Sequence, residues 1–391
     1  MLLAIIYLAF IGLGLPDSLL GSAWPQMSGD LGAQTSAAGL VTMTICACTI
    51  VSSLACDALQ RRLGTARLTT ASVALTAAGI LGFSRVTEFW QLVAIAVPYG
   101  LGAGAVDAAL NAYAAVHLKP MHVSWLHCCW GIGASVGPMI MAWRMGAGDS
   151  WRGGYVAVGL MLVALTAFLV LTLRSWDTAT PAAAAGDGDR RAADTSIPSR
   201  AEALRLPGVV PAFLSFFLYC ALESTTGVWS STFMVQARGI DEQTATFLVS
   251  LFYLGITVGR FLSGVLTLRL RGNQLLRLGV AIIAVGLVLL VAVPGATACA
   301  TGLVLVGIGC APIYPTIIQL TPSRFGDGAS QALMGPQMAC AYVGSLSFPP
   351  ITGLVLQHVA PGAYPWLLLA LLAGFALTLA ATNRACARAT R

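Results

Sequence analysis

Long apolar segments alternate with short polar stretches along the whole chain. A helix needs about 20 apolar residues to cross roughly 30 Å of hydrocarbon, and a window of about 19 residues finds such segments. Twelve segments of this kind occur. The pattern predicts an all-α polytopic membrane protein with transmembrane helices at 2–24, 36–56, 67–84, 90–116, 123–145, 153–174, 209–235, 243–267, 274–293, 297–319, 329–357 and 363–383.

Composition supports a bilayer as the environment of the chain. Of the 391 residues, 57% are hydrophobic and only 9% are charged. A typical soluble domain has about 25% charged residues, so a water-soluble fold would lack polar surface. The first segment has neither a basic leader nor a small-residue cleavage site, and we expect it to remain as the first helix.

Basic residues are distributed unevenly between the two sets of loops. With both termini on one side, sixteen basic residues fall on that side and four on the other. The positive-inside rule then predicts cytoplasmic termini, and we expect a multi-pass protein of the bacterial inner (plasma) membrane. The net charge of +6 is therefore a topology signal, and no nucleic-acid partner is predicted. The sixteen are Arg61, Arg62, Arg67, Lys119, Arg174, Arg190, Arg191, Arg200, Arg205, Arg269, Arg271, Arg277, Arg324, Arg384, Arg388 and Arg391.

The chain contains ten cysteines, and nine of them lie in apolar segments. Buried free cysteine behaves as a small hydrophobic residue. The sequence has no CxxC pair with a partner pair, so we expect ten reduced thiols and predict no metal or cofactor.

A change of composition divides the twelve segments into six and six. Residues 176–206 are rich in Ala, Gly, Asp, Arg, Pro and Ser, which is typical of a solvated linker. We therefore predict two pseudo-symmetric six-helix bundles, 1–175 and 207–391, joined by a cytoplasmic linker. A shift of 207 residues aligns LQRRLG (59–64) with LTLRLRG (266–272). Internal repeats of this kind are typical of transporters that hold a solute where the halves meet.

Three acidic residues interrupt the apolar segments: Asp17, Asp107 and Glu223. An ionisable group at membrane depth is costly and marks a functional site by default. A low dielectric disfavours the ionised form of a carboxyl group, which brings proton uptake towards neutral pH. We therefore predict that these three residues couple transport to protons and that Asp17, Asp107 and Glu223 also contact the solute.

Helical spacing places further polar residues beside the first two acids. Asp17 and Trp24 are seven residues apart, and Asp107 and Asn111 are four apart, so each pair shares a helix face. Structural alternatives remain open for both acids. Pro16 frees a backbone group that Asp17 can cap, and Asp107 can serve only as an interhelical hydrogen-bond partner.

The second half offers matching polar stripes. The segments at 209–235 and 243–267 each contain one such stripe. Glu223 and Arg260 are the opposite charges buried in these segments, so we expect an ion pair between them. The 207-residue shift places Tyr314 and Gln337 at the positions of Asp107 and Trp130. For each residue, a plain interhelical hydrogen bond is the alternative. The stripes comprise Glu223, Thr226 and Ser230 with Trp229 nearby, and Tyr253, Thr257 and Arg260.

Several motifs resemble those of one family along essentially the whole chain. Twelve segments, a central linker and basic loops after the second and eighth segments resemble the major facilitator superfamily. Within it, GLPDSLLGSAWP, GLGAGAVDAALNAY, LHCCWGIGASVGP and GITVGRFLSG resemble the fucose permease-like group of proton-coupled sugar transporters. That resemblance implies proton coupling and sugar binding by Asp17, Asp107 and Asn111, and sugar contact by His127 and Trp130.

The chain departs from the family pattern between the second and third segments. The usual loop motif resembles GxLxDRxGRR, whereas this chain reads DALQRRLG at 57–64 and has arginine in place of the motif's Asp. The resemblance therefore does not extend to the latch that the family forms with this Asp.

Two functions remain in competition. The favoured one is proton symport of a small polar solute, a sugar by resemblance, through alternating access by a monomer. The alternative is a proton-coupled exporter of amphipathic compounds, because Gly133 to Pro138 partly matches the drug/proton antiporter motif. An enzyme is not predicted, since no triad, metal cluster or phosphate loop occurs at a common membrane depth.

Overall fold

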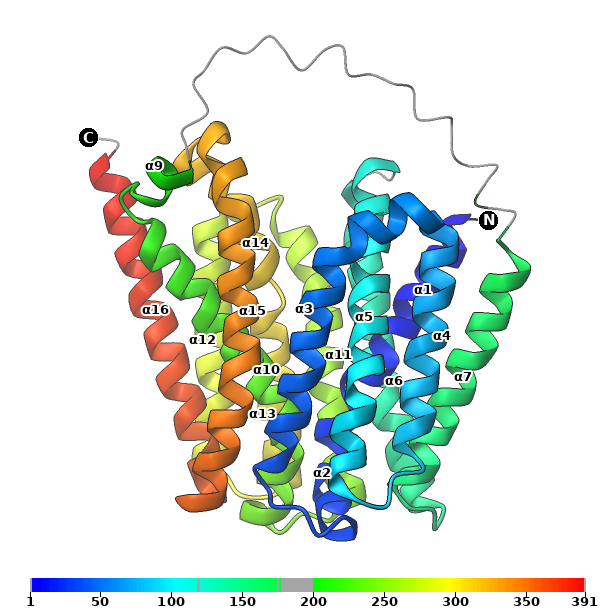
Figure 1. Ribbon diagram of the computed structural model, residues 1–391. Helices are drawn as coiled ribbons and strands as arrows, with labels where there is room; N and C mark the ends of the chain where they lie inside the picture. The colour runs from blue at the N-terminus through cyan, green and yellow to red at the C-terminus, as the bar shows by residue number, and fades with distance from the viewer. Residues whose placement is uncertain (1, 118–119, 174–175, 177–199, 390–391) are drawn as a thin grey trace.

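A computed structural model describes residues 2–117, 120–173, 176 and 200–389, and these residues form helices without any strand. Figure 1 shows the helices running roughly parallel in one bundle. The first half contains α1 Leu2–Asp17, α2 Leu19–Asp30, α3 Ala37–Leu63, α4 Thr65–Phe83, α5 Phe89–His117, α6 Pro120–Gly146 and α7 Trp151–Leu171. The second contains α9 Arg200–Leu204, α10 Val209–Arg238, α11 Glu242–Leu266, α12 Gly272–Ala292, α13 Ala296–Cys310, α14 Ile313–Phe325, α15 Asp327–His358, the 3₁₀ turn η1 Pro361–Ala363 and α16 Tyr364–Ala389.

The predicted all-α membrane architecture is confirmed. Within the described residues, eleven helical stretches are long and apolar enough to cross a membrane. α6, with 27 residues, occupies the position of the remaining predicted segment. Helices satisfy all their backbone hydrogen bonds internally, and this is why apolar segments of this length adopt them in lipid.

Two of the predicted segments are broken helices. α1 and α2 form a single stretch, Leu2–Asp30, with a break at Ser18 just after Pro16 and Asp17. α13 and α14 likewise share the stretch Ala296–Phe325, with a break at Ala311 and Pro312. Proline removes a backbone donor and disturbs the preceding turn, so both breaks have a cause in the sequence.

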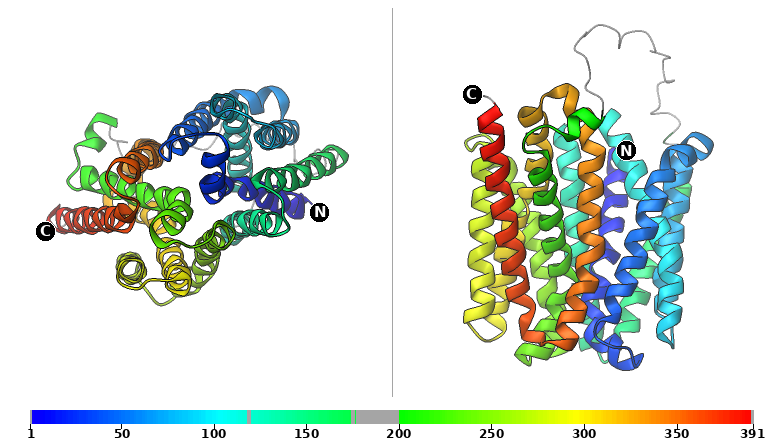
Figure 2. Two further views of the ribbon diagram at one scale, coloured as in Figure 1. Left: turned by 90° about the horizontal axis from the view of Figure 1, so that it is seen from below. Right: turned by 60° about the vertical axis from the view of Figure 1, so that its left-hand side comes forward.

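The helices gather into two groups that follow chain order. In Figures 1 and 2, α1 to α7 lie on one side of the molecule and α10 to α16 on the other. We call the end where α1 begins and α16 ends the terminal end, and the opposite end the far end. Residues 177–199, most of the predicted linker, lie outside the described residues, and the predicted domain boundaries stay a prediction.

Small residues allow close packing within and between the groups. α1 packs on α6, where a Cβ on Gly14 would overlap the Trp130 carbonyl oxygen and one on Gly133 would overlap that of Ile11. Between the groups, α6 packs on α11, α3 on α15, and α2 on α10. Contacts through glycine are typical of membrane helices, because close backbone approach replaces the missing hydrophobic drive.

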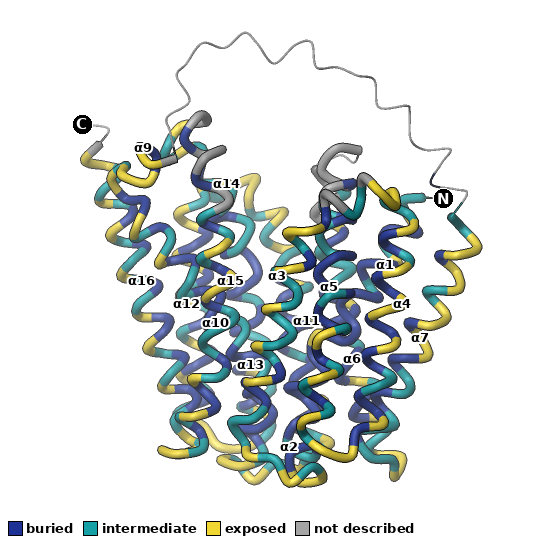
Figure 3. Tube along the Cα trace, viewed as in Figure 1, coloured by how far each residue is buried: buried dark blue, intermediate teal, exposed yellow. Residues whose placement is uncertain are grey.

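Burial follows the arrangement of the helices. Buried residues lie on the inner faces in Figure 3, while large apolar side chains such as Leu54, Leu171 and Leu377 are exposed on the outside. Apolar surface of this kind suits contact with lipid. Within the described residues, no disulfide bond joins any of the cysteines.

Candidate functional site between the two halves

The break between α1 and α2 positions the side chain of Asp17. Its Oδ2 accepts a hydrogen bond from Trp130 Nε1 at 2.7 Å, and its Oδ1 accepts one from the Tyr99 hydroxyl at 3.4 Å. Residues on both sides of Asp17 are buried, yet Asp17 itself is exposed. A carboxylate in the middle of a membrane-spanning stretch is thus held by donors from α5 and α6 and still reaches solvent.

Asp107 on α5 is the second acid at this site. Asn111, one turn further along the helix, donates from Nδ2 to Asp107 Oδ1 at 2.8 Å and to the Asp107 carbonyl oxygen at 3.0 Å. Asp107 lies within electrostatic range of Asp17 and of Tyr314 and Tyr342 from the other half. The two acids therefore share one polar region.

Arg260 on α11 contributes the positive charge of this region. Its Nη1 donates to the His127 carbonyl oxygen at 3.1 Å, and its Cζ lies 5.1 Å from the centre of the Trp130 ring. Trp130 also meets Tyr253 edge to face, with ring centres 6.2 Å apart. Trp130 therefore contacts Asp17 of its own half and also Arg260 and Tyr253 of the second half.

The expected ion pair between Glu223 and Arg260 is wrong for this conformation. Within the described residues, the ion pairs join Arg144 to Asp149 and Arg152 to Asp30. Arg260 stays within electrostatic range of Glu223, but it takes the His127 carbonyl and the Trp130 ring as its close partners. A cation–π contact and a backbone acceptor satisfy the guanidinium without direct contact to a carboxylate.

Glu223 on α10 lies among tyrosines. It is partly buried and within electrostatic range of Tyr219, Tyr253 and Tyr314. The Tyr314 hydroxyl itself lies 3.6 Å from Met338 Sδ. The tyrosines around Glu223 thus come from three helices of its own half, α10, α11 and α14.

Four predicted site residues are engaged elsewhere. Trp24 is fully buried, and its Nε1 donates to the Thr35 carbonyl oxygen at 2.9 Å. Trp229 is also fully buried and donates to the Pro349 carbonyl oxygen at 2.8 Å. The remaining two bond within or between neighbouring helices: Thr226 donates to the Leu222 carbonyl oxygen, and Gln337 accepts from Thr321.

His127 lies at the edge of the site. Its ring is partly buried and meets Phe10 edge to face, with ring centres 6.0 Å apart. Its backbone carbonyl, rather than its ring, contacts Arg260. In this conformation His127 therefore links α6 to α11 through its backbone.

Polar contacts join the two halves at the far end. The hydroxyls of Ser231 and Thr246 both donate to the Ser22 carbonyl oxygen, at 3.1 Å and 2.9 Å, and all three residues are buried. Nearby, Gln357 accepts from the Ser36 amide at 3.2 Å and donates to Gln34 at 3.0 Å. We call Ser22, Ser231 and Thr246 the far-end latch.

The latch lies on the far-end side of Asp17. Ser22 lies one turn beyond Asp17 towards the far end and is fully buried, whereas Asp17 is exposed. Ser22, Ser231 and Thr246 therefore close the space between the two halves on the far-end side of Asp17.

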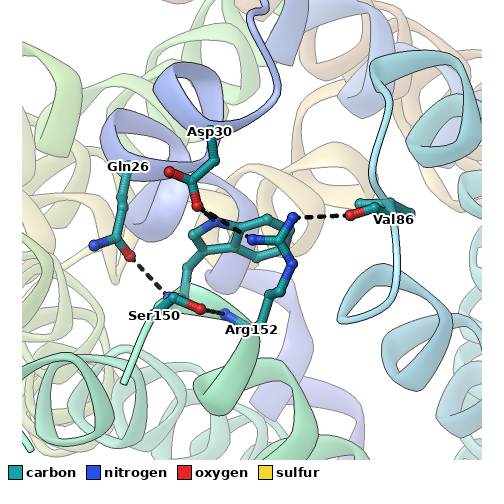
Figure 4. Close-up of polar contacts among 6 residues, drawn as sticks. Gln26, Asp30, Val86, Ser150 and Arg152 are labelled. Carbon is teal, nitrogen blue, oxygen red and sulfur yellow. Dashed lines mark hydrogen bonds and ion pairs between the residues drawn. The ribbon is translucent and has the colours of Figure 1, made fainter. Parts of the chain in front are cut away.

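A polar cluster that sequence reasoning missed fixes the far end of the first half (Figure 4). Arg152 donates to Asp30 Oδ2 at 3.2 Å and to the Val86 carbonyl oxygen at 2.9 Å. Asp30 also accepts from Trp151 Nε1 at 2.8 Å, and Gln26 accepts from the Trp151 amide at 2.8 Å. The end of α2 is thus tied to the start of α7 and to the loop between α4 and α5.

Two tyrosines of the site were also missed. Tyr99 on α5 donates to Asp17, and Tyr342 on α15 lies within electrostatic range of Asp107. Tyr99 stands eight residues before Asp107 on the same helix, a spacing that places both on one face. That spacing could have identified Tyr99 as a residue of the site.

Comparisons with known proteins agree with this architecture. Residues 6–349 and 212–385 match the Major Facilitator Superfamily. Among solved structures, the nucleoside transporter NupG is similar with a TM-score of 0.74 and 13% identity, over 97% of this chain and 98% of that one. A bacterial homologue of the human lysosomal transporter Spinster, in an inward-facing and unoccupied conformation, is similar with a TM-score of 0.68 and 14% identity. The similarity covers 98% of this chain and 93% of that one.

A curated relative is similar over part of its length. "Bypass of stop codon protein 6" of Saccharomyces cerevisiae is 24% identical over 205 residues, which are 48% of this chain and 41% of that protein. The match thus spans about two fifths of the relative. The family match covers most of the chain, with its two ranges overlapping in the second half. The chain belongs to the Major Facilitator Superfamily.

Proposed function

We propose that this transporter moves a small polar solute, a sugar or a compound with a sugar-like ring, together with protons by alternating access. The observation that carries the proposal is Asp17. Its carboxylate is exposed midway along the membrane-spanning stretch Leu2–Asp30, accepts hydrogen bonds from Trp130 and Tyr99, and lies within electrostatic range of a second acid, Asp107. Fixed acids without a partner cation are the groups through which proton relays in transporters work.

Charge explains why a proton has to move with the solute. Closing the terminal end over Asp17 and Asp107 would enclose two carboxylates in a region of low dielectric, which is costly unless they are neutralised. A proton on one of them lowers that cost. Protonation and occupation by solute thereby both favour the closed intermediate, and the two move in the same direction.

The groups around the acids suit a ring that carries hydroxyls. Trp130 offers a flat apolar face, while Asn111, Tyr253 and Tyr314 offer directed donors and acceptors. Sites for polar ligands combine such faces with a few convergent polar groups. This chemistry, and the sequence motifs in α1, α5, α6 and α11, support membership of the fucose permease-like group.

One of the similar solved structures widens the range of solutes to be tested. NupG is a nucleoside transporter, and a nucleoside contains a sugar ring that the same groups would suit. The exporter alternative rests on the partial motif from Gly133 to Pro138. In the structure Gly133 and Gly137 pack against backbone oxygens of α1, which gives this motif a packing role.

We further propose that the terminal end faces the cytoplasm of a bacterial inner membrane. The sixteen basic residues that the sequence pattern assigns to this side support the orientation. The far-end latch would then seal the outer side.

The proposal is tested with purified protein in liposomes. Monosaccharides, nucleosides and amphipathic drugs are offered under pH gradients of either direction, and internal pH is recorded alongside uptake. We expect one sugar or nucleoside to accumulate under an inward proton gradient. Accumulation of a drug under the opposite gradient would instead establish export.

Asp107→Asn sharpens this test. The substitution keeps the side chain's size and its contact with Asn111 but removes the titratable group. We expect it to abolish gradient-driven accumulation while exchange of labelled for unlabelled solute continues at least in part. Undiminished accumulation in this variant would show that Asp107 is not the coupling acid.

A further inference from the structure

A groove lies between α12 and α16 at the terminal end, far from the central acids. It has a volume of about 430 Å³. The two helices stand at the outer edge of the second half (Figures 1 and 2), so the groove belongs to the membrane-facing side of the bundle. Its lining residues are Arg277, Val280, Ala376, Leu379, Ala380, Asn383, Arg384 and Ala387.

The end of the groove that lies at the membrane surface is basic. Arg277 at the start of α12 and Arg384 near the end of α16 both line it, and both side chains are exposed. Neither takes part in an ion pair within the described residues. The helices α12, α14 and α16 contain no Asp or Glu at all, so these helices supply no counter-ion.

A third arginine, Arg324, holds the side chain of Asn383, a neutral residue that lines the same groove. Arg324 at the end of α14 donates to Asn383 Oδ1 at 2.9 Å and to Asn273 Oδ1 at 2.8 Å. Asn383 itself lines the groove, and within the described residues its side-chain NH₂ donates no hydrogen bond. Two arginines and one asparagine therefore line the same space.

The rest of the groove is apolar and continues onto the outer face. Val280, Ala376, Leu379 and Ala380 form its wall deeper in the membrane. Leu377, on the adjoining surface of α16, is 71% exposed. A ligand that fits has an anionic head at the membrane surface and an apolar tail along the helices.

We propose that the α12/α16 groove binds an anionic phospholipid, with its phosphate held by Arg277, Arg384 and the Asn383 amide. Basic pockets between transmembrane helices on the cytoplasmic side recognise such headgroups, and arginine matches a phosphate with paired donors. The apolar wall favours a lipid over free phosphate, because only a lipid also buries an acyl chain there. The site is separate from the transport pathway and does not depend on the proposed solute.

The test uses the full chain in detergent and native mass spectrometry. Phosphatidylglycerol and phosphatidylcholine are added to the wild type and to the double variant Arg277→Gln, Arg384→Gln. The matched control, Arg205→Gln with Arg269→Gln, removes the same charge from exposed terminal-end positions outside the groove. Unfolding curves verify that all three proteins are folded.

We expect the wild type to retain phosphatidylglycerol in preference to phosphatidylcholine. A basic side chain near the surface contributes about a fivefold gain in binding, so the double variant should lose roughly 25-fold while the control stays within about twofold of wild type. Equal retention by the double variant and the control would overturn the proposal. So would complete displacement of the lipid by millimolar inorganic phosphate, because the groove would then be a site for free anions.

Discussion

Asp17 combines two properties that single residues in membranes rarely share. It accepts hydrogen bonds from two aromatic side chains, Trp130 and Tyr99, and it remains exposed. An acid with a purely structural role would be fully enclosed by its donors, since a buried charge needs every available partner. At the residue scale, we therefore expect the carboxyl group of Asp17 to change its protonation state during transport.

Close contact between α1 and α6 makes Gly14 sensitive to any added atom. A Cβ there would overlap the carbonyl oxygen of Trp130, and backbone cannot move aside cheaply. Gly14→Ala should lower the free energy of unfolding by roughly 1–3 kcal/mol, as overpacking does. Denaturant unfolding in detergent measures this.

Gly29 on α2 provides the matched control for Gly14. It is exposed, and a Cβ there would meet no atom within 4 Å. Gly29→Ala should leave stability unchanged or raise it slightly, because alanine favours helix over glycine. Equal losses in both variants would show that the α1/α6 contact is looser than described.

Asp241 gives the far end a pH-dependent element outside the membrane. As N-cap of α11, its side chain accepts the Thr244 amide hydrogen at 2.8 Å, and this backbone hydrogen bond lowers the pKa of the carboxyl group below its ordinary value. A lowered pKa in the folded state means that the cap stabilises fully above the unfolded pKa of about 4 and is lost as pH falls below it.

The Asp241 cap is tested by substitution at two pH values. Asp241→Ala should cost about 1 kcal/mol at pH 7, whereas Asp241→Asn should cost much less, because asparagine also caps. The difference between wild type and Asp241→Ala should shrink at pH 3. Unfolding curves that keep the same difference at both pH values would contradict this account.

At the scale of elements, the far-end latch holds α2 against α10 and α11. Its hydroxyls on Ser231 and Thr246 converge on one carbonyl oxygen of Ser22. That oxygen lies just after the break at Ser18, where helix α2 has begun anew. The break thus leaves Asp17 exposed and places the start of α2 in contact with α10 and α11 of the second half.

Weakening the latch should shift the protein towards opening at the far end. Hydrogen bonds between membrane helices contribute on average about 0.6 kcal/mol each, so Ser231→Ala with Thr246→Val should change the balance by about 1 kcal/mol, or roughly fivefold. Hydrogen exchange at the far-end turns of α2 and α11 should become faster by that factor.

Ser250 on α11 serves as the control for the latch. Its buried hydroxyl donates to the Phe247 carbonyl oxygen of its own helix and does not cross between the halves. Ser250→Ala should leave far-end exchange as in wild type. If it accelerates exchange as much as the latch variant does, loss of any buried hydroxyl would explain the effect.

The elements could be predicted from sequence to a greater extent than the site. Hydropathy located all the spans because each apolar segment must satisfy its own backbone in lipid. It ended the second segment at 56, whereas α3 continues to Leu63, since a helix can extend into the polar surface where apolarity no longer marks it. The breaks follow Pro16 and coincide with Pro312, but Pro98, Pro138 and Pro349 lie inside unbroken helices, so proline alone could not locate the breaks.

Contacts between helices within the site could not be predicted from helical periodicity. The bond between Asp17 and Trp130 joins residues 113 positions apart, and spacing within one helix carries no information about such pairs. The expectation of a Glu223–Arg260 pair failed for a related reason. It considered charges of one half alone, whereas Arg260 finds its partners, the Trp130 ring and the His127 carbonyl, in the other half.

At the scale of the whole molecule, the two halves meet differently at their two ends. Buried hydroxyls join them at the far end, while the exposed acid Asp17 lies on the terminal-end side of these contacts. Alternating access requires that such an arrangement has an opposite counterpart of similar free energy. The modest strength of the latch is consistent with this requirement, since a ligand and a proton then suffice to shift the balance.

The central claim is that solute and proton cross together and that Asp17 takes part. The most direct measurement is the internal pH of liposomes without an imposed gradient when solute is added outside. We predict that the interior becomes acidic with the wild type, and that Asp17→Asn exchanges labelled solute without any change of internal pH. An alkaline shift, or solute entry without proton movement in the wild type, would contradict the account.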